Sequence, residues 1–302
     1  DEAETVMQRE QLGTGHAVLQ AEPLLKDVEG TILVTCGDTP LVTAETFQAL
    51  LNCHEKTAAA ATILTAVMPD PTGYGRIIRD DQGQVEQKDG TPEELAVAEV
   101  NAGIYCFDST LLWKLLHTVT NDNAQGEYYL TDIIGMLVSA GQRVSAFAAP
   151  DYQETLGVNS RLQMAEAEKV LRQRKLVQLM TDGVTVIDPA NTYVDMTVTI
   201  GRDSILYPGT ILEGDTVIGE GCHIGPYVRM TNVVMGNDDH LQFTYAHDCE
   251  IKNGCEIGPF VHFRPNTVIG NDVKVGNYME VKNSNIGDGT KLPHLSYIGD
   301  SD

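Results

Sequence analysis

The segment TVTIGRDSILYPGTILEGDTVIGEGCHIGPYVRM (residues 197–230) carries an aliphatic residue at every sixth position. The spacing continues toward the end of the chain after two shorter steps. A strand alternates every two residues and a helix every 3.6, so a period of six predicts short strands separated by turns. The sequence therefore predicts a parallel β-helix. The repeating residues are Ile200, Leu206, Leu212, Ile218, Ile224, Met230, Met235, Leu241, Ile251, Ile257, Phe263, Ile269, Val275, Val281, Ile286, Leu292 and Ile298.

Three such hexads make one triangular coil of the predicted β-helix. Residues one unbroken coil apart then lie above one another at the strand spacing of about 4.8 Å. Each coil buries its aliphatic side chains only against neighbouring coils, so the array needs caps at its ends. A loop-rich β-sandwich is the alternative fold, but it gives no reason for the regular spacing.

The composition restricts the classes of function. The 302 residues include 43 acidic and 20 basic ones, for a net charge of −23, and this argues against a nucleic-acid partner, which needs a basic face. The six cysteines form no C-x2-C pair, so we expect a reduced, cytoplasmic protein. The longest apolar run, residues 58–68, is too short to span a membrane.

The first half of the sequence alternates predicted strands with predicted helices. Apolar runs at residues 31–36, 61–68 and 101–107 predict strands, and residues 43–53 and 133–140 predict helices. This order predicts an α/β domain with a mostly parallel sheet covered by helices on both faces. The run at 31–36 is typical of a buried parallel strand. A helical segment over 161–180 predicts a connector to the repeats.

Two short motifs in this half suggest a ligand site. Gly13 and Gly15 allow close approach of a ligand, and Thr14 could cap the following helix, although an ordinary capped loop has the same sequence pattern. Asp38 follows a predicted strand at the edge where open α/β sheets bind ligands. It could hold a metal ion, or it could simply begin a turn.

The repeats place two cations in neighbouring coils. Arg264 and Lys282 are 18 residues apart, so they stack, and two like charges about 5 Å apart repel by about 3 kcal/mol at an effective dielectric constant of about 20. An anion such as a phosphate between them would remove the conflict, as would solvation of side chains that turn outward. His294 should point off the outer wall, where an imidazole suits general-base chemistry. Tyr297 either lines the same groove or is an ordinary surface residue.

The motifs taken together resemble one bacterial family. They are QREQLGTG (8–15), GDTPL (37–41), GYGRI (73–77), VEQKDGTPE (85–93), NAGIYCF (101–107), NAQGEYYLTDII (123–134), GVNSRLQ (157–163), IGPFVHFRP (257–265), VGNYMEVK (275–282) and HLSYIGD (294–300). The chain is similar over its whole length to the bifunctional N-acetylglucosamine-1-phosphate uridyltransferase / glucosamine-1-phosphate acetyltransferases. Crossover connections between parallel strands are normally right-handed. The left-handed sense of the β-helix is therefore implied by this resemblance alone.

The resemblance implies an architecture and two reactions. An incomplete Rossmann-like nucleotidyltransferase domain (1–160) would be joined by a linker helix (161–182) to a left-handed β-helix acetyltransferase domain (183–302) in a homotrimer. The protein would acetylate glucosamine-1-phosphate with acetyl-CoA, then transfer UMP from UTP to N-acetylglucosamine-1-phosphate with Mg²⁺. These steps make UDP-N-acetylglucosamine for peptidoglycan.

The resemblance also implies roles for single residues. Gln8, Gln11, Gly13 and Thr14 would contact UTP, Asp38 and Asn159 would hold Mg²⁺, and Gly75, Glu86 and Asn101 would bind the sugar. Arg264, Lys282 and Tyr297 would bind the acceptor sugar phosphate, His294 would be the general base, and Glu280 lies in the same motif with a less certain role.

The sequence departs from the family pattern in three places. The family's first strand with its Gly-rich triphosphate loop, its last coils, and a few residues near Gln84 and Val85 have no counterpart, so we expect segments of a longer chain to be missing there. Two alternatives follow from these departures. One is an acetyltransferase with a vestigial nucleotidyltransferase half, and the other is a non-catalytic trimeric scaffold or sugar-nucleotide sensor.

Overall fold

The computed structural model describes residues 3–79, 85–86 and 96–302. The chain divides into two compact units, Asp1–Ala167 and Glu168–Asp302. The division falls inside helix α6, Arg161–Thr181. The fold class predicted from the sequence, an α/β nucleotidyltransferase domain followed by a left-handed parallel β-helix, is confirmed.

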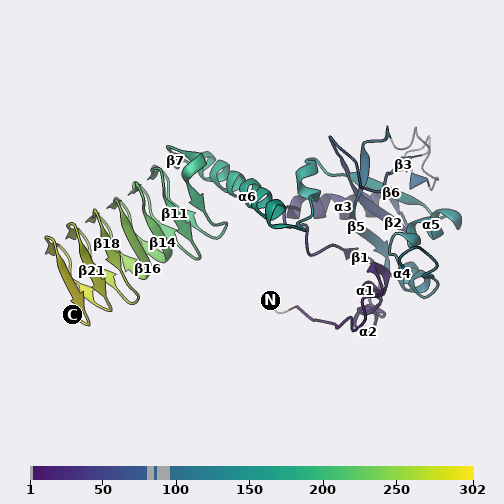
Figure 1. Ribbon diagram of the computed structural model, residues 1–302, viewed down its shortest axis with the longest axis horizontal. Coiled ribbons are helices and arrows are strands. Elements are labelled where there is room, and N and C mark those ends of the chain that lie inside the picture. The colour runs from purple at the N-terminus through teal and green to yellow at the C-terminus, as the bar shows by residue number, and fades with distance from the viewer. Residues whose placement is uncertain (1–2, 80–84, 87–95) are drawn as a thin grey trace. The chain divides into compact units, whose positions relative to one another are not determined.

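The first unit contains a four-stranded sheet with the order β1-β5-β2-β6 (Figure 1). Its helices and strands before α6 are α1 (Thr14–Leu19), α2 (Glu22–Leu25), β1 (Thr31–Val34), α3 (Ala44–Thr57), β2 (Ala61–Val67), β3 (Ile78–Arg79), β4 (Val85–Glu86), β5 (Glu99–Asp108), α4 (Ser109–Leu116), α5 (Asp132–Ser139), β6 (Val144–Ala148) and the 3-10 helix η2 (Tyr152–Thr155).

Alternating side chains of this sheet enter two separate cores. Leu64 of β2 and Ile104 of β5 pack with Leu50 of α3 on one face. Ile63 and Tyr105, their immediate neighbours, pack against α4 and α5 on the other face. The expected helices on both faces are therefore confirmed, because successive residues of a strand point to opposite sides.

Two expectations for this sheet were wrong. β5 runs antiparallel to both β1 and β2, and only the β2–β6 pair is parallel. β1 was expected to be buried, but its residues are partly exposed because β5 is its single neighbour in the described sheet. A gap in the sequence was expected near Gln84 and Val85. Gln84 lies outside the described residues, and Val85 belongs to β4, which pairs antiparallel with β3.

The second unit is a stack of parallel coils after the last turns of α6 (green to yellow in Figure 1). Three ladders of strands run along it: β7-β10-β13-β15-β17-β20-β23, then β8-β11-β14-β16-β18-β21-β24, and β9-β12-β14-β16-β19-β22. The last two ladders share β14 and β16, which are long enough to continue around a corner.

The strands of this unit are short, as the period of six predicts. They are β7 (Thr185–Val186), β8 (Tyr193–Val194), β9 (Thr199–Ile200), β10 (Ile205–Leu206), β11 (Ile211–Glu213), β12 (Val217–Ile218), β13 (His223–Ile224), β14 (Arg229–Met235), β15 (His240–Leu241), β16 (Thr244–Ile251), β17 (Glu256–Ile257), β18 (Val261–Phe263), β19 (Val268–Ile269), β20 (Lys274–Val275), β21 (Met279–Lys282), β22 (Asn285–Ile286), β23 (Lys291–Leu292) and β24 (Ser296–Gly299), with the 3-10 helix η3 (Pro189–Asn191).

The aliphatic residues of the repeat form the core of the β-helix. Those from Leu206 to Val281 are buried, and those at the two ends, Ile200, Ile286, Leu292 and Ile298, are partly buried. At the first coil, Leu176 and Leu179 of α6 join this core, and the Lys175 ammonium donates a hydrogen bond to the carbonyl of Met196 (3.0 Å). The last turns of α6 therefore cap the first coil of the array.

Candidate functional site

The QLGTG motif lies against a segment more than a hundred residues later in the chain. The amide of Gly15 donates to the carbonyl of Tyr128, and the amide of Tyr128 donates to the carbonyl of Leu12 (both 2.8 Å). A Cβ on Gly13 would lie 2.7 Å from the Tyr128 carbonyl oxygen, so only glycine fits there. The QLGTG motif and the NAQGEYYLTDII motif are thus in contact.

Thr14 was expected to cap the helix, and this was wrong. Helix α1 begins at Thr14 itself, and its N-cap is Gly13, with φ at 105° and no side-chain hydrogen bond. The Thr14 hydroxyl instead accepts a hydrogen bond from the amide of Leu130 (3.0 Å). Thr14 therefore fixes the contact between the two motifs rather than the start of the helix.

Gln8 is held close to the same motif. Its amide nitrogen lies 3.2 Å from the carbonyl oxygen of Gly13 and 3.0 Å from Nδ1 of His16. His16 was not singled out from the sequence, although it directly follows the GTG triplet. Gln11 is exposed beside this cluster. A carboxamide and an imidazole beside a glycine backbone provide the donors and acceptors that recognise a nucleobase edge.

Asp38 and Asn159 come together over Gly157. An atom at the Cβ position of Gly157 would lie 3.5 Å from Nδ2 of Asn159 and 3.7 Å from Oδ2 of Asp38. The amide of Val158 donates to the carbonyl of Asp38 (2.8 Å), which holds the two segments in register. Both side chains are exposed. One carboxylate and one carboxamide with open surroundings suit a magnesium ion, which keeps several waters and phosphate ligands.

The residues predicted to bind the sugar lie on adjoining segments. The amide of Asn101 donates to the carbonyl of Gly75 (2.9 Å), so these two residues are in contact. The Asn101 side chain accepts from the amide of Gly103 (2.8 Å) and donates to the Tyr105 hydroxyl (2.9 Å). Glu86 pairs with Ile78 through the β3–β4 ladder, but its side chain lies outside the described part of the chain.

Arg264 and Lys282 occupy successive coils in register, as predicted, since their preceding residues Phe263 and Val281 are ladder partners. The structure adds a partner that the spacing did not indicate. Arg264 Nη1 lies 3.0 Å from Oε1 of Glu280, so a carboxylate already offsets part of the expected repulsion. The repulsion therefore does not by itself demand a bound anion.

Three aromatic rings adjoin this ion pair. His262, the ladder partner of Glu280, stacks on Tyr245 (5.0 Å between centroids, 18° between planes) and on His247 (5.8 Å, 28°). Burial lowers the pKa of His262. The negative charge of Glu280 acts to raise this pKa, but His247 and Arg264 act to lower it, and the pKa stays below its usual value. The ring is therefore neutral near neutral pH. No motif or spacing indicates this cluster, because it depends on which outward residues share a ladder.

Tyr297 continues the ladder that contains His262 and Glu280. Its side chain is 58% exposed, so it lines this face rather than the core. His294 is also exposed, as predicted, and lies between β23 and β24 at the corner before this face. The face therefore presents a cation pair, a carboxylate and a phenol on one wall of the β-helix.

Within the described residues, no helix is long and apolar enough to cross a membrane, and the six cysteines are free thiols. The same residues contain no group of three or more His, Cys, Asp or Glu side chains placed to hold a metal ion. Any metal at Asp38 and Asn159 would thus depend on water and substrate for its remaining ligands.

An α/β sheet with a glycine-rich motif, followed in the same chain by a hexapeptide β-helix with a cation pair on one wall, defines a two-domain transferase that acts on nucleotides and sugar phosphates. Residues 2–168 match the family model described as "Nucleotidyl transferase", and residues 189–288 match "GMPPB C-terminal domain". The chain belongs to the bifunctional protein GlmU family of nucleotidyl transferases.

The curated relatives are similar over the whole chain. A bifunctional protein GlmU of Geobacillus sp. (strain WCH70) is 53% identical over 306 residues, covering 100% of this chain and 67% of the relative. The corresponding protein of Geobacillus thermodenitrificans is 51% identical (100% and 66%), and that of Listeria welshimeri is 47% identical (99% and 66%). The chain thus spans about two thirds of the length of these relatives. Membership confirms the family resemblance and the transferase class predicted from the motifs.

Proposed function

We propose that this chain carries two transfer sites, one in each unit, that together convert glucosamine-1-phosphate into UDP-N-acetylglucosamine. The joining of a nucleotidyl transferase unit to a β-helix that aligns Arg264 and Lys282 is the observation that carries the proposal. We also place these reactions in the cytoplasm, since all six cysteines are free thiols and reduced thiols persist there.

In the first unit, uridylyl transfer needs a held nucleotide and an oriented sugar phosphate. Gln8, Gln11 and the backbone of Gly13 and Thr14 would bind the uracil end, and Gly75, Glu86 and Asn101 the N-acetylglucosamine end. Asp38 and Asn159 would hold Mg²⁺, which would neutralise charge on the triphosphate. The sugar phosphate oxygen would then bond to the α-phosphorus of UTP as the bond to pyrophosphate breaks.

In the β-helix, acetyl transfer needs a fixed acceptor phosphate and a base near the amine. Arg264 and Lys282 would bind the phosphate of glucosamine-1-phosphate, with Glu280 and Tyr297 beside the sugar. His294 would take the proton from the amine as the amine nitrogen bonds to the acetyl carbon. The bond from the acetyl carbon to sulfur would break, and the sulfur would receive that proton from His294 as coenzyme A leaves as the thiol. Neutral His262 adds no positive charge to this wall, so the two cations are balanced by Glu280 and the substrate.

Two assays test the two halves separately. We expect Mg²⁺-dependent pyrophosphate release from UTP and N-acetylglucosamine-1-phosphate, which Asp38→Asn should reduce at least about 100-fold. We expect thiol release from acetyl-CoA with glucosamine-1-phosphate, which His294→Ala should abolish and His240→Gln, on a different sheet, should not change. Thiol release alone would favour the acetyltransferase with a vestigial partner, and neither activity would favour the scaffold or sensor.

We further propose that the protein assembles as a homotrimer through one corner of the β-helix. The aromatic ridge, defined as Tyr227, Phe243, Phe260 and Tyr278, runs along successive coils with ring centroids 5.2–5.4 Å apart. Tyr227, Phe260 and Tyr278 are each at least 50% exposed. Beside the ridge lies a groove of about 570 Å³ lined by Ile211, Val228 and Val261 among others. A continuous apolar ridge and groove suit a second copy of the chain.

A further inference from the structure

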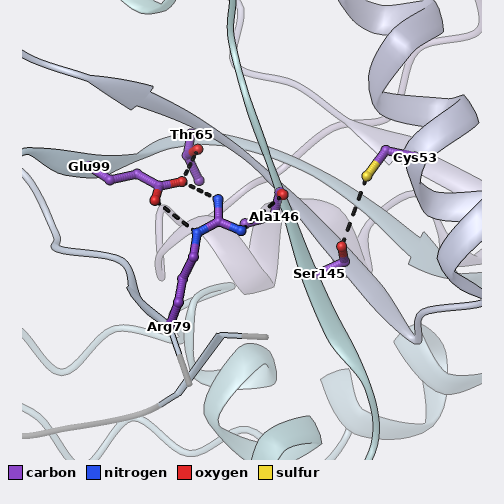
Figure 2. Close-up of polar contacts among 6 residues, drawn as sticks. All are labelled: Cys53, Thr65, Arg79, Glu99, Ser145 and Ala146. Atoms are coloured by element: carbon purple, nitrogen blue, oxygen red, sulfur yellow. Dashed lines mark hydrogen bonds and ion pairs between the residues drawn. The ribbon is translucent and has the colours of Figure 1, made fainter. Parts of the chain in front are cut away.

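An ion pair that no sequence motif indicated joins β3 to β5 in the first unit (Figure 2). Arg79 of β3 binds Glu99 of β5 with both Nε (2.9 Å) and Nη2. Glu99 Oε1 also accepts the Thr65 hydroxyl (2.5 Å), and Arg79 Nη1 reaches the carbonyl of Ala146 (3.4 Å). One arginine thus connects β3 to β5 and β6, and Glu99 connects it to β2.

The pair is sheltered from solvent. The side chains of Arg79 and Glu99 are 31% and 18% exposed. Burial alone would raise the pKa of Glu99, but the hydrogen bonds from Arg79 and Thr65 lower it. The hydrogen bond to Glu99 raises the pKa of Arg79. Both groups are therefore charged at neutral pH, and a bidentate charge-assisted contact of this kind fixes orientation as well as energy.

The two ends of this ion pair lie on the segments that carry the candidate sugar residues. Glu99 is two residues before Asn101 on β5, and Thr65 is the ladder partner of Asn101. Residues 75–79 run alongside β5 and carry Gly75 at one end and Arg79 at the other. The amide of Ile77 donates to the carbonyl of Glu99 (3.0 Å), and the amide of Asn101 donates to the carbonyl of Gly75 (2.9 Å). These backbone bonds and the ion pair together hold residues 75–79 on β5.

We propose that the Arg79–Glu99 ion pair positions the sugar site, by fixing the segment that carries Gly75 against the strand that carries Asn101. This inference rests on the proposed uridyltransferase function. Arg79 and Glu99 touch no reacting atom in this scheme, and they act through the placement of the two sugar-binding residues. The pair should therefore govern the affinity for N-acetylglucosamine-1-phosphate and leave the affinity for UTP unchanged.

Steady-state kinetics on Arg79→Gln, Glu99→Gln and the double variant test the proposal. Each single change should raise the KM for N-acetylglucosamine-1-phosphate about fivefold to twentyfold and change the KM for UTP less than about twofold. The double variant should raise this KM no further than the more damaging of the two single changes, because each single change already removes the same interaction. His117→Gln, which removes the exposed pair with Glu22 in the same unit, should leave both constants unchanged. Equal increases in both KM values, or additive effects, would overturn the proposal.

Hydrogen exchange gives a readout that does not need catalysis. The amides of Ile77 and Asn101 should exchange at least about fivefold faster in the Arg79→Gln variant, whereas the Gly15 amide, bonded to Tyr128, should not change. A wild-type chain that shows no UTP turnover would contradict the proposed function and leave the exchange experiment valid. Unchanged exchange at Ile77 and Asn101 would contradict the positioning role itself.

Discussion

Asp239 is a buried carboxyl group in the core of the β-helix. It is 0% exposed, and its Oδ1 accepts the amide of Cys255 (2.7 Å), whereas Oδ2 has no hydrogen-bond partner among the described residues. Two coils earlier, Ser204 makes the equivalent bond to the amide of Cys222 (3.0 Å) without a charge. This position of the coil therefore requires a hydrogen-bond acceptor but not a carboxylate. Burial raises the pKa of Asp239 to about 7.

This pKa predicts how stability depends on pH. Between about pH 4 and 7 the folded state retains a proton on Asp239 that the unfolded state has lost, so the free energy of unfolding falls as pH rises through this window. At about pH 8 the ionised group should cost about 2–4 kcal/mol. We expect Asp239→Asn to be more stable than wild type at about pH 8 and equal to it near pH 4, measured by urea denaturation.

The reference for this experiment is Asp239→Ser, which copies the side chain of Ser204. It should show the same reduced pH dependence as Asp239→Asn, although its smaller volume lowers stability at every pH. Parallel stability curves for wild type and Asp239→Asn between about pH 4 and 8 would show that Asp239 does not titrate in this window.

At the scale of the coil, one corner alternates glycine with aspartate. Gly221, Asp238, Gly254 and Asp272 follow one another from coil to coil with φ between 54° and 72°. A Cβ on Gly254 would lie 2.7 Å from Oδ1 of Asp272, so each aspartate side chain occupies the space above a glycine. Asparagine and aspartate adopt this left-handed conformation at low cost, which explains the polar turn residues of the hexads.

The alternation predicts a specific double-mutant result. Gly254→Ala should destabilise the β-helix by about 2–3 kcal/mol, from the strain of a positive φ plus the clash with Asp272. Asp272→Gly should cost about 1 kcal/mol or less, because glycine tolerates the same φ. In the double variant the clash is absent, so chemical denaturation should show less destabilisation than the sum of the two single changes. A strictly additive result would mean that the side chain of Asp272 does not occupy that space.

Regular elements were the part of the structure that the sequence could predict. The period of six determines which side chain of each hexad is inward, and the buried residues from Leu206 to Val281 follow it. The direction of β5 was not predictable, because an apolar run such as Ile104 to Phe107 has the same pattern in either direction. The ion pair of Arg264 with Glu280 was missed because it is a diagonal contact between coils, which the spacing of residues directly above one another does not indicate.

For the candidate site, the sequence motifs identified which segments of the chain contribute to it. The contacts between those segments became visible only in the structure. The sequence placed Asp38 after a strand and Asn159 before a helix, but only the fold brings both over Gly157. The Arg79–Glu99 pair had no signal, since single charged residues in a strand are most often solvated. Long-range polar contacts of this type depend on register and topology together.

At the scale of the whole molecule, charge opposes assembly and the aromatic ridge favours it. A net charge of −23 makes copies of the chain repel, and this repulsion weakens as salt shortens the screening length to about 10 Å at 0.1 M. The ridge holds aromatic residues at φ values of 44–61°, a conformation that bulky side chains adopt at a cost of about 1–3 kcal/mol each. Stacking of neighbouring rings, worth about 0.5–1.5 kcal/mol, does not fully offset that strain within one chain.

The Phe260→Asn substitution should weaken assembly while it leaves the stability of the isolated chain nearly unchanged. Asparagine accepts the φ of 61° that Phe260 adopts, so relief of strain should balance the absence of ring stacking, and the free energy of unfolding of the isolated chain should change by about 1 kcal/mol or less. Burial of a phenylalanine between copies is worth about 1.5–3 kcal/mol, so without it self-association should require protein concentrations at least about tenfold higher. Sedimentation velocity over a range of protein and salt concentrations measures this.

The matched control is Asp272→Asn at the glycine–aspartate corner, which keeps a left-handed turn and should leave association unchanged. Added salt should strengthen association of the wild type, because it screens like charges while the apolar contact persists. If Phe260→Asn associates as the wild type does, the copies meet through another face. If salt dissociates the assembly, ion pairs rather than the aromatic ridge hold it together, since only a charge-based contact weakens under screening.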